Sequence, residues 1–128
     1  NGSKEVNIGV GLNEGYTELL THRYFDQNHK MPKTYKLEMD IASKLENIIG
    51  KDEMQRLYLN ADLLGLIDSL KQYMSENDII KFINDVDFIN HHNERIILED
   101  VIMKNTIKNI YNFISKANQI KLKNIKTI

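Results

Sequence analysis

Hydrophobic residues recur every three or four positions along most of the chain, which is the spacing of an α-helix with one buried face. The pattern predicts a first helix over residues 13–27. Residues 28–33 should form a loop, because Pro32 restricts its own backbone and that of Met31 before it. The apolar members of the first helix are Leu12, Tyr16, Leu19, Leu20 and Phe25.

A second helix is predicted over residues 34–49, with Gly50 as its C-terminal stop. Asp52 and Gln55 have the spacing of a capping box and should open a short third helix, KDEMQRLYL. The buried stripe of the second helix is expected to contain Ile41, Ala42, Leu45, Ile48 and Ile49.

Two further helices follow with little glycine or proline between them. Asn60 is the expected N-cap of the first, and Ser75 with Asp78 has the spacing of an N-terminal start for the second. Their apolar stripes are Leu63, Leu66, Ile67, Leu70 and Met74 in the first, and Ile79, Ile80, Ile83 and Val86 in the second.

The last and longest helix should begin near His92 or Asn93 and run towards Ala117, since apolar residues recur at helical spacing from Ile96 onwards. The segment QIKLKNIKT after it alternates apolar and polar residues like a strand without a partner, so residues 120–128 are expected to form a basic tail. The predicted fold is all-α, an irregular bundle of five to six helices that forms one domain over residues 4–119.

A chain of 128 residues with 41% hydrophobic and 27% charged residues can bury a core without disulfides. It has no cysteine, so a metal site would have to use His, Asp and Glu. No apolar run reaches the roughly 20 residues that span a bilayer, so a soluble and by default cytoplasmic protein is expected. The opening residues 1–3, Asn-Gly-Ser, resemble a cloning or cleavage scar, which would make the chain a piece of a larger protein.

Charge is distributed unevenly although the formal net charge is only −1. Six lysines and no acidic residue follow Asp100, which leaves an excess of acidic residues before it. Such an end can contact nucleic acid or anionic lipid. The lysines lack interleaved aromatic residues, so nucleic-acid binding is not expected and a solvated helix face is the simpler interpretation.

Candidate chemistry lies in the stretch GLNEGYTELLTHRYF near the N-terminus. Glu14, Glu18 and His22 are four residues apart, so on a helix their side chains line one face. Carboxylate and imidazole groups together suit zinc and related divalent cations. The same spacing is also common on solvated helix surfaces, so it does not by itself distinguish a metal site from an acidic stripe.

The string LNEGYTELL resembles the segment that carries the third zinc ligand in the gluzincin metallopeptidases, which contains an NEG motif. The resemblance covers about ten residues. It implies that Glu14 is a zinc ligand, that Asn13 caps or holds the neighbouring backbone, and that Glu18 supports a zinc-bound histidine by a hydrogen bond. Gly15 would let the zinc helix approach closely, and His22 is a possible accessory residue with no counterpart in the motif.

In that superfamily an HExxH helix supplies two histidines for zinc and a glutamate that activates water. No HExxH occurs here: the histidines are His22, His29, His91 and His92, and none begins that motif. The resemblance therefore implies zinc only together with an upstream segment, peptide or protein substrates, and no peptidase activity of this chain alone. The helices after residue 27 would then wall the substrate cleft.

Two hypotheses from different classes follow. Either the chain is the C-terminal helical region of a zinc metallopeptidase, or it is a non-enzymatic helical interaction domain whose Glu14, Glu18 and His22 form a solvated stripe. They predict different surroundings for Glu14. A ligand should point into a partly dry concave region, and a surface residue should lie on a wet convex face.

Overall fold

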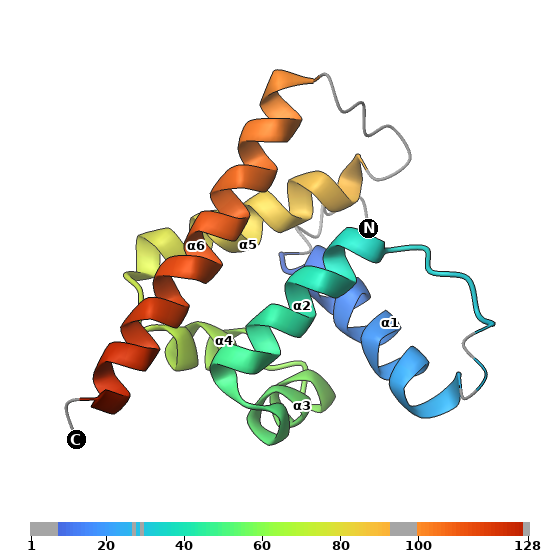
Figure 1. Ribbon diagram of the computed structural model, residues 1–128, viewed down its shortest axis with the longest axis horizontal. Helices are drawn as coiled ribbons and strands as arrows, with labels where there is room; N and C mark the ends of the chain where they lie inside the picture. The colour runs from blue at the N-terminus through green and yellow to red at the C-terminus, as the bar shows by residue number, and fades with distance from the viewer. Residues whose placement is uncertain (1–7, 27, 29, 93–99, 127–128) are drawn as a thin grey trace, which may run out of the picture.

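The computed structural model describes residues 8–26, 28, 30–92 and 100–126, and in these ranges the chain forms six α-helices and no strand. The all-α prediction is therefore confirmed. In Figure 1 α1 and α2 lie side by side, and α6 crosses α5. The helices are α1 (Val10–Phe25), α2 (Lys36–Ile49), α3 (Lys51–Leu59), α4 (Leu63–Leu70), α5 (Glu76–His91) and α6 (Val101–Lys126).

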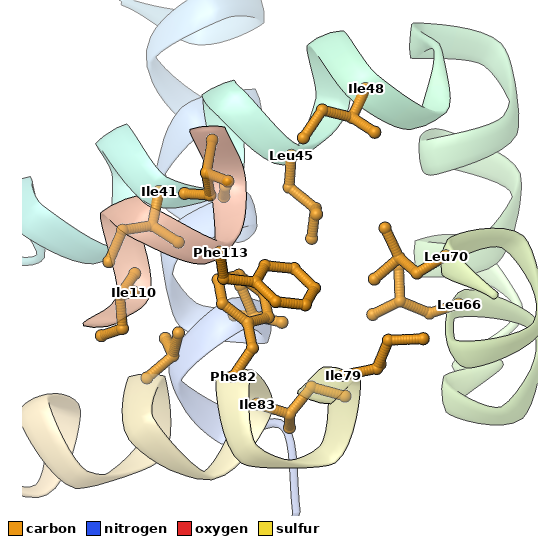
Figure 2. Packing of buried hydrophobic residues seen from close by; sticks show 14 of the residues in the cluster. Ile41, Leu45, Ile48, Leu66, Leu70, Ile79, Phe82, Ile83, Ile110 and Phe113 are labelled. Carbon is orange, nitrogen blue, oxygen red and sulfur yellow. The ribbon is translucent and has the colours of Figure 1, made fainter. Parts of the chain in front are cut away.

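The core lies where α2, α4, α5 and α6 face one another (Figure 2). The rings of Phe82 and Phe113 stack at its centre with their centroids 4.2 Å apart. The predicted stripes supply most of the remaining core, because one face of each helix is apolar at the helical period. Fully buried aliphatic residues include Ile41, Leu45, Ile48, Leu70, Ile79, Ile83, Val86 and Ile110.

The start of α1 is earlier than predicted, at Val10 instead of Asn13. The backbone N–H groups of Gly9 and Gly11 donate to the two carboxylate oxygens of Asp87 on α5, at 2.8 and 2.9 Å. A distant carboxylate thus satisfies the free N–H groups of the first turn. Asn13 lies inside the helix, so its predicted N-cap role is wrong.

The ends of α1 and α2 differ in smaller ways. α1 ends at Phe25, and the predicted end at residue 27 lies outside the described residues. Phe25 is 79% exposed although it was expected on the apolar face, since it is the last residue of the helix and lies beyond the core. α2 begins at Lys36, two residues later than predicted. It ends at Ile49, and Gly50 follows as the predicted stop, at a φ of 102°.

Of the three predicted helix starts that follow, only Ser75 is confirmed, where the hydroxyl accepts from the N–H of Asp78 at 3.2 Å. The predicted helix KDEMQRLYL is observed as α3, but its capping box is wrong, because Asp52 lies inside the helix and Gly50 precedes it without a side-chain cap. The cap of α4 is Asp62 instead of Asn60; its carboxylate accepts from the N–H of Gly65 at 2.8 Å. α4 ends at Leu70, before Met74.

The predicted last helix and the tail are both revised. α5 continues to His91 with His92 as its C-cap, and residues 93–99, where the last helix was expected to begin, lie outside the described part of the chain. α6 extends to Lys126, so most of the segment expected as a tail is helical. Lys121 donates to two carbonyl groups at the end of α2, those of Asn47 at 2.9 Å and Ile48 at 2.8 Å, which anchors this part of α6. No helix of the described residues is long and apolar enough to cross a membrane.

A cluster of hydrogen bonds with a salt bridge joins α1 to α2. The guanidinium of Arg23 donates to both oxygens of the buried Glu46, at 3.0 and 2.7 Å, and the hydroxyl of Tyr16 donates to Oε2 at 2.6 Å. Burial by itself would raise the pKa of Glu46, but the hydrogen bonds from Arg23 and Tyr16 outweigh it and lower the pKa below its ordinary value. Burial and the bond to Glu46 raise the pKa of Tyr16. The folded state therefore favours the ionised form of the Glu46 carboxyl group.

The substitution Glu46→Gln should destabilise the protein at pH 7 by about 1.5–3 kcal/mol, because a carboxylate that accepts charged hydrogen bonds is lost. A carboxyl whose pKa is lowered by folding contributes stability above its unfolded pKa and loses it as the pH falls through the folded pKa. The difference between wild type and variant should therefore shrink as the pH is lowered from about 5 towards 3. Urea unfolding at several pH values measures this.

The control is Glu53→Gln, since Glu53 pairs with Arg56 on an exposed face of α3. Its effect should be much smaller at every pH. A stability difference for Glu46→Gln that does not vary with pH would contradict the proposed role of its charge.

Candidate functional site

Glu14 lies half-buried on α1, at the point where α1, α2 and α5 meet. The side-chain amide of Asn90, on α5, donates to Glu14 Oε2 at 2.9 Å. The same amide nitrogen donates to Oε2 of Glu38, on α2, at 2.8 Å. Two carboxylates from different helices therefore share one neutral donor, and we call Glu14, Glu38 and Asn90 the carboxylate pocket.

Glu38 is the most unusual member of the carboxylate pocket. It is 1% exposed, and its second oxygen, Oε1, has no hydrogen-bond partner within the described part of the chain. A buried polar atom without a partner costs free energy, and most such atoms in folded proteins find a donor or acceptor. This oxygen is therefore the atom of the pocket that could still accept an interaction from a ligand or a further group.

Gly15 brings the two carboxylates together. A Cβ at this position would lie far inside van der Waals contact with the backbone carbonyl of Glu38. Only glycine lets α1 approach α2 so closely, and the residue next to it, Glu14, is carried to the same junction. The helix that approaches Gly15 is α2, and the approach of a zinc helix implied by the motif stays a prediction.

Tyr35, the N-cap residue of α2, is the next neighbour of Glu14. Interaction with the Glu14 carboxylate raises the pKa of the Tyr35 hydroxyl above its ordinary value. Glu14 therefore interacts with two neutral polar groups, and no described ion pair contains Glu14 or Glu38.

Glu18, one turn along from Glu14, holds the loop that leads into α2. Its two oxygens accept the backbone N–H groups of Thr34 and Tyr35, at 2.5 and 2.6 Å. Both oxygens thus have donors from the chain itself. The predicted role of Glu18 towards a zinc-bound histidine stays a prediction.

His22 and Asn13, the other predicted site residues, lie apart from the carboxylate pocket. Nδ1 of His22 is 2.9 Å from Oδ2 of Asp26, and Nε2 is 3.9 Å from Glu18. Burial opposes ionisation of Asp26, yet the hydrogen bonds from His22 and from the N–H groups of Met31 and Lys30 lower its pKa. His22 therefore helps to shape the loop after α1.

Asn13 borders an apolar cavity of about 270 Å³ between α1, α3 and α4, whose walls include Leu12, Tyr16, Leu57 and Leu66. Glu14 does not line this cavity. Asn13 thus belongs to the apolar cavity and Glu14 to the carboxylate pocket, although the two residues are neighbours on α1.

No group of three His, Cys, Asp or Glu residues that could hold a metal ion is found among the described residues. Glu14, Glu18 and His22 share a helix face as predicted, but their hydrogen bonds lead to three different neighbours. The arrangement provides an anionic, partly buried pair of oxygens, which can contribute to a cation site without completing one.

The sequence reasoning missed Glu38, Asn90 and Tyr35. A signal was present for the first two. Glu38 precedes Ile41, Ala42 and Leu45 on the buried stripe of α2, and Asn90 follows Ile83 and Val86 on that of α5, so each is a polar residue at an apolar position. Such residues are buried only with a compensating interaction.

Comparison with models of known protein families, with curated proteins and with solved structures finds no match to this chain.

The substitution Gly15→Ala tests the contact that forms the pocket. Alanine favours a helix over glycine by up to about 1 kcal/mol, so a neutral site would gain stability. Here the added methyl group must displace α2, and we expect a net loss of about 1–3 kcal/mol. Thermal or urea unfolding measures it. Asn118→Ala, on the exposed face of α6, is the control and should be close to neutral; a Gly15→Ala variant as stable as wild type would refute the close packing.

Proposed function

We propose that this chain is the C-terminal helical region of a gluzincin-like zinc metallopeptidase, in which Glu14 is a zinc ligand. The observation that carries the proposal is the position of Glu14. Glu14 is half-buried at a junction of three helices, and its carboxylate accepts a hydrogen bond from Asn90. A glutamate on a solvated stripe would have no such fixed surroundings.

The electrostatics of the pocket support a cation. Two carboxylates approach one amide nitrogen, and no described Lys, Arg or His pairs with either of them. Like charges that are close together in a partly buried place repel each other unless a positive charge lies between them. A divalent cation supplies that charge, and carboxylate oxygens are among the ligands that zinc accepts.

The residues present fit one part of a zinc site, and the other protein donors would come from outside this chain, as the HExxH helix of the gluzincins does. When bound, zinc polarises the peptide carbonyl and lowers the pKa of bound water, which allows hydrolysis at neutral pH. The contribution of this chain is to hold one ligand in a fixed direction. Asn90 orients the carboxylate by its hydrogen bond. Gly15 allows the close distance between α1 and α2.

The rest of the bundle serves as a rigid support in this proposal. α2 and α5 hold the pocket from two sides, and both are anchored in the core by fully buried stripes. A metal ligand needs such support, because misplacement by about 1 Å weakens both binding and catalysis. The helices after α1 would also form part of the wall beside a peptide substrate.

A non-enzymatic interaction domain is the alternative, and one observation favours it. The apolar cavity beside Asn13 is open to solvent next to Ile8, which is 51% exposed, and an apolar surface of this kind can receive a partner. The peptidase needs the Glu14 carboxylate as a zinc ligand, and the interaction domain does not.

The decisive experiment uses the natural polypeptide that contains this segment. We expect its sequence to contain HExxH before Glu14, and the purified protein to hold one zinc ion and to cleave peptides. Glu14→Ala should lower zinc affinity by about tenfold or more, with peptide hydrolysis lost, because a catalytic site needs three protein ligands. Metal analysis by mass spectrometry and a fluorogenic peptide assay measure the two effects.

The exposed Glu53→Gln variant is the control and should keep both zinc and activity. A natural polypeptide without HExxH, or a Glu14→Ala variant with unchanged zinc content, would overturn the peptidase proposal and favour the interaction domain.

A further inference from the structure

One atom of the carboxylate pocket has no interaction in the described structure. Oε2 of Glu38 accepts from Asn90, while Oε1 of the same buried carboxylate has no partner. The other buried carboxylates differ. Both oxygens of Glu46 accept from Arg23, and both oxygens of Asp26 accept backbone N–H groups.

Glu38 has almost no contact with bulk solvent. The residue is 1% exposed, so Oε1 without a hydrogen-bond partner carries a cost in free energy. Natural sequences retain such an energetic cost mainly where the residue has a function, because an apolar or amide residue of similar size would remove it.

The surroundings of the Glu38 carboxylate indicate the kind of group that its Oε1 would bind. Asn90 donates to Glu38 and Glu14 with the same nitrogen, so the two carboxylates face one small region. A further neutral donor would satisfy the oxygen but leave both negative charges unbalanced. A divalent cation satisfies the oxygen and balances the two charges together.

Glu18 is a weaker candidate for this second position, although the spacing of the motif points to it. Its two oxygens already accept the N–H groups of Thr34 and Tyr35. Turning either oxygen to a metal would break a hydrogen bond that holds the loop before α2. Glu38 has a free oxygen and loses nothing by such a contact.

We propose that Glu38 is a second oxygen donor to the divalent cation that Glu14 binds, through its unpartnered Oε1. This inference rests on the proposed function, since it takes Glu14 as a ligand. It adds a residue from α2 that the motif does not contain. Glu14 and Glu38 then form a two-carboxylate half-site that this chain presents by itself, with Asn90 as the residue that positions both.

The test uses the 128-residue chain with Zn²⁺ as the probe, by calorimetry and by the zinc-dependent rise in melting temperature. We expect weak binding, since two carboxylates fall short of a complete site. Glu38→Gln and Glu14→Gln should each lower zinc affinity by about tenfold or more. The matched control Glu53→Gln, at a carboxylate on α3 away from this site, should leave it unchanged.

A second measurement separates a metal role from a structural one. Glu38→Gln without zinc should be at least as stable as wild type, because it removes a buried charge that has no ionic partner. A structural role predicts the opposite, a lower melting temperature in the absence of metal, and this result would overturn the inference.

The outcomes also separate this inference from the proposed function. Zinc affinity that falls in Glu14→Gln but stays unchanged in Glu38→Gln would overturn the role of Glu38 and leave the Glu14 ligand in place. A wild-type chain without any zinc-dependent change would overturn the half-site, while the zinc content of the natural polypeptide would still decide the role of Glu14.

Discussion

The close contact between the glycine face of α1 and its two neighbours determines the geometry of this protein. Gly15 leaves room for the backbone of α2 at Glu38, and Gly11 leaves room for the backbone of α5 at Val86. Side chains at these positions would push α1 away from both helices, because packed interiors cannot yield by such amounts without cost. The same contact directs Glu14 into the bundle, so the packing of the helix and the position of the candidate ligand have one cause.

Three carboxylates that join one helix to another follow a common rule. Asp87 holds the first turn of α1, Glu46 binds Arg23 and Tyr16, and Asp40 binds Tyr111 and Lys44, so each carboxylate has donors for both oxygens. These interactions connect helices that are far apart in sequence. Glu38 departs from the rule, since one of its oxygens is buried without a donor. A deviation of this kind is expected at functional sites, where an interaction is kept free for a ligand.

The two carboxylates of the motif on α1 have separate uses. Glu14 and Glu18 were expected to act together because they lie one helical turn apart. In the structure Glu14 turns towards Asn90, and Glu18 closes the loop that enters α2. The partner that shares the environment of Glu14 is Glu38, from the next helix. Spacing along one helix therefore indicated which residues share a face, and the neighbouring helices decided which of them act together.

The sequence alone determined the helical class, the buried stripes, the Gly50 stop and the Ser75 start, because these depend on the helical period and on local backbone preferences. It also singled out Glu14. It could not locate the start of α1, whose N–H groups bind Asp87, or the helical end of α6, which Lys121 anchors on α2. The carboxylate pocket was hidden for the same reason. Glu38 and Asn90 are 24 and 76 residues from Glu14, and only the packing of three helices brings them together.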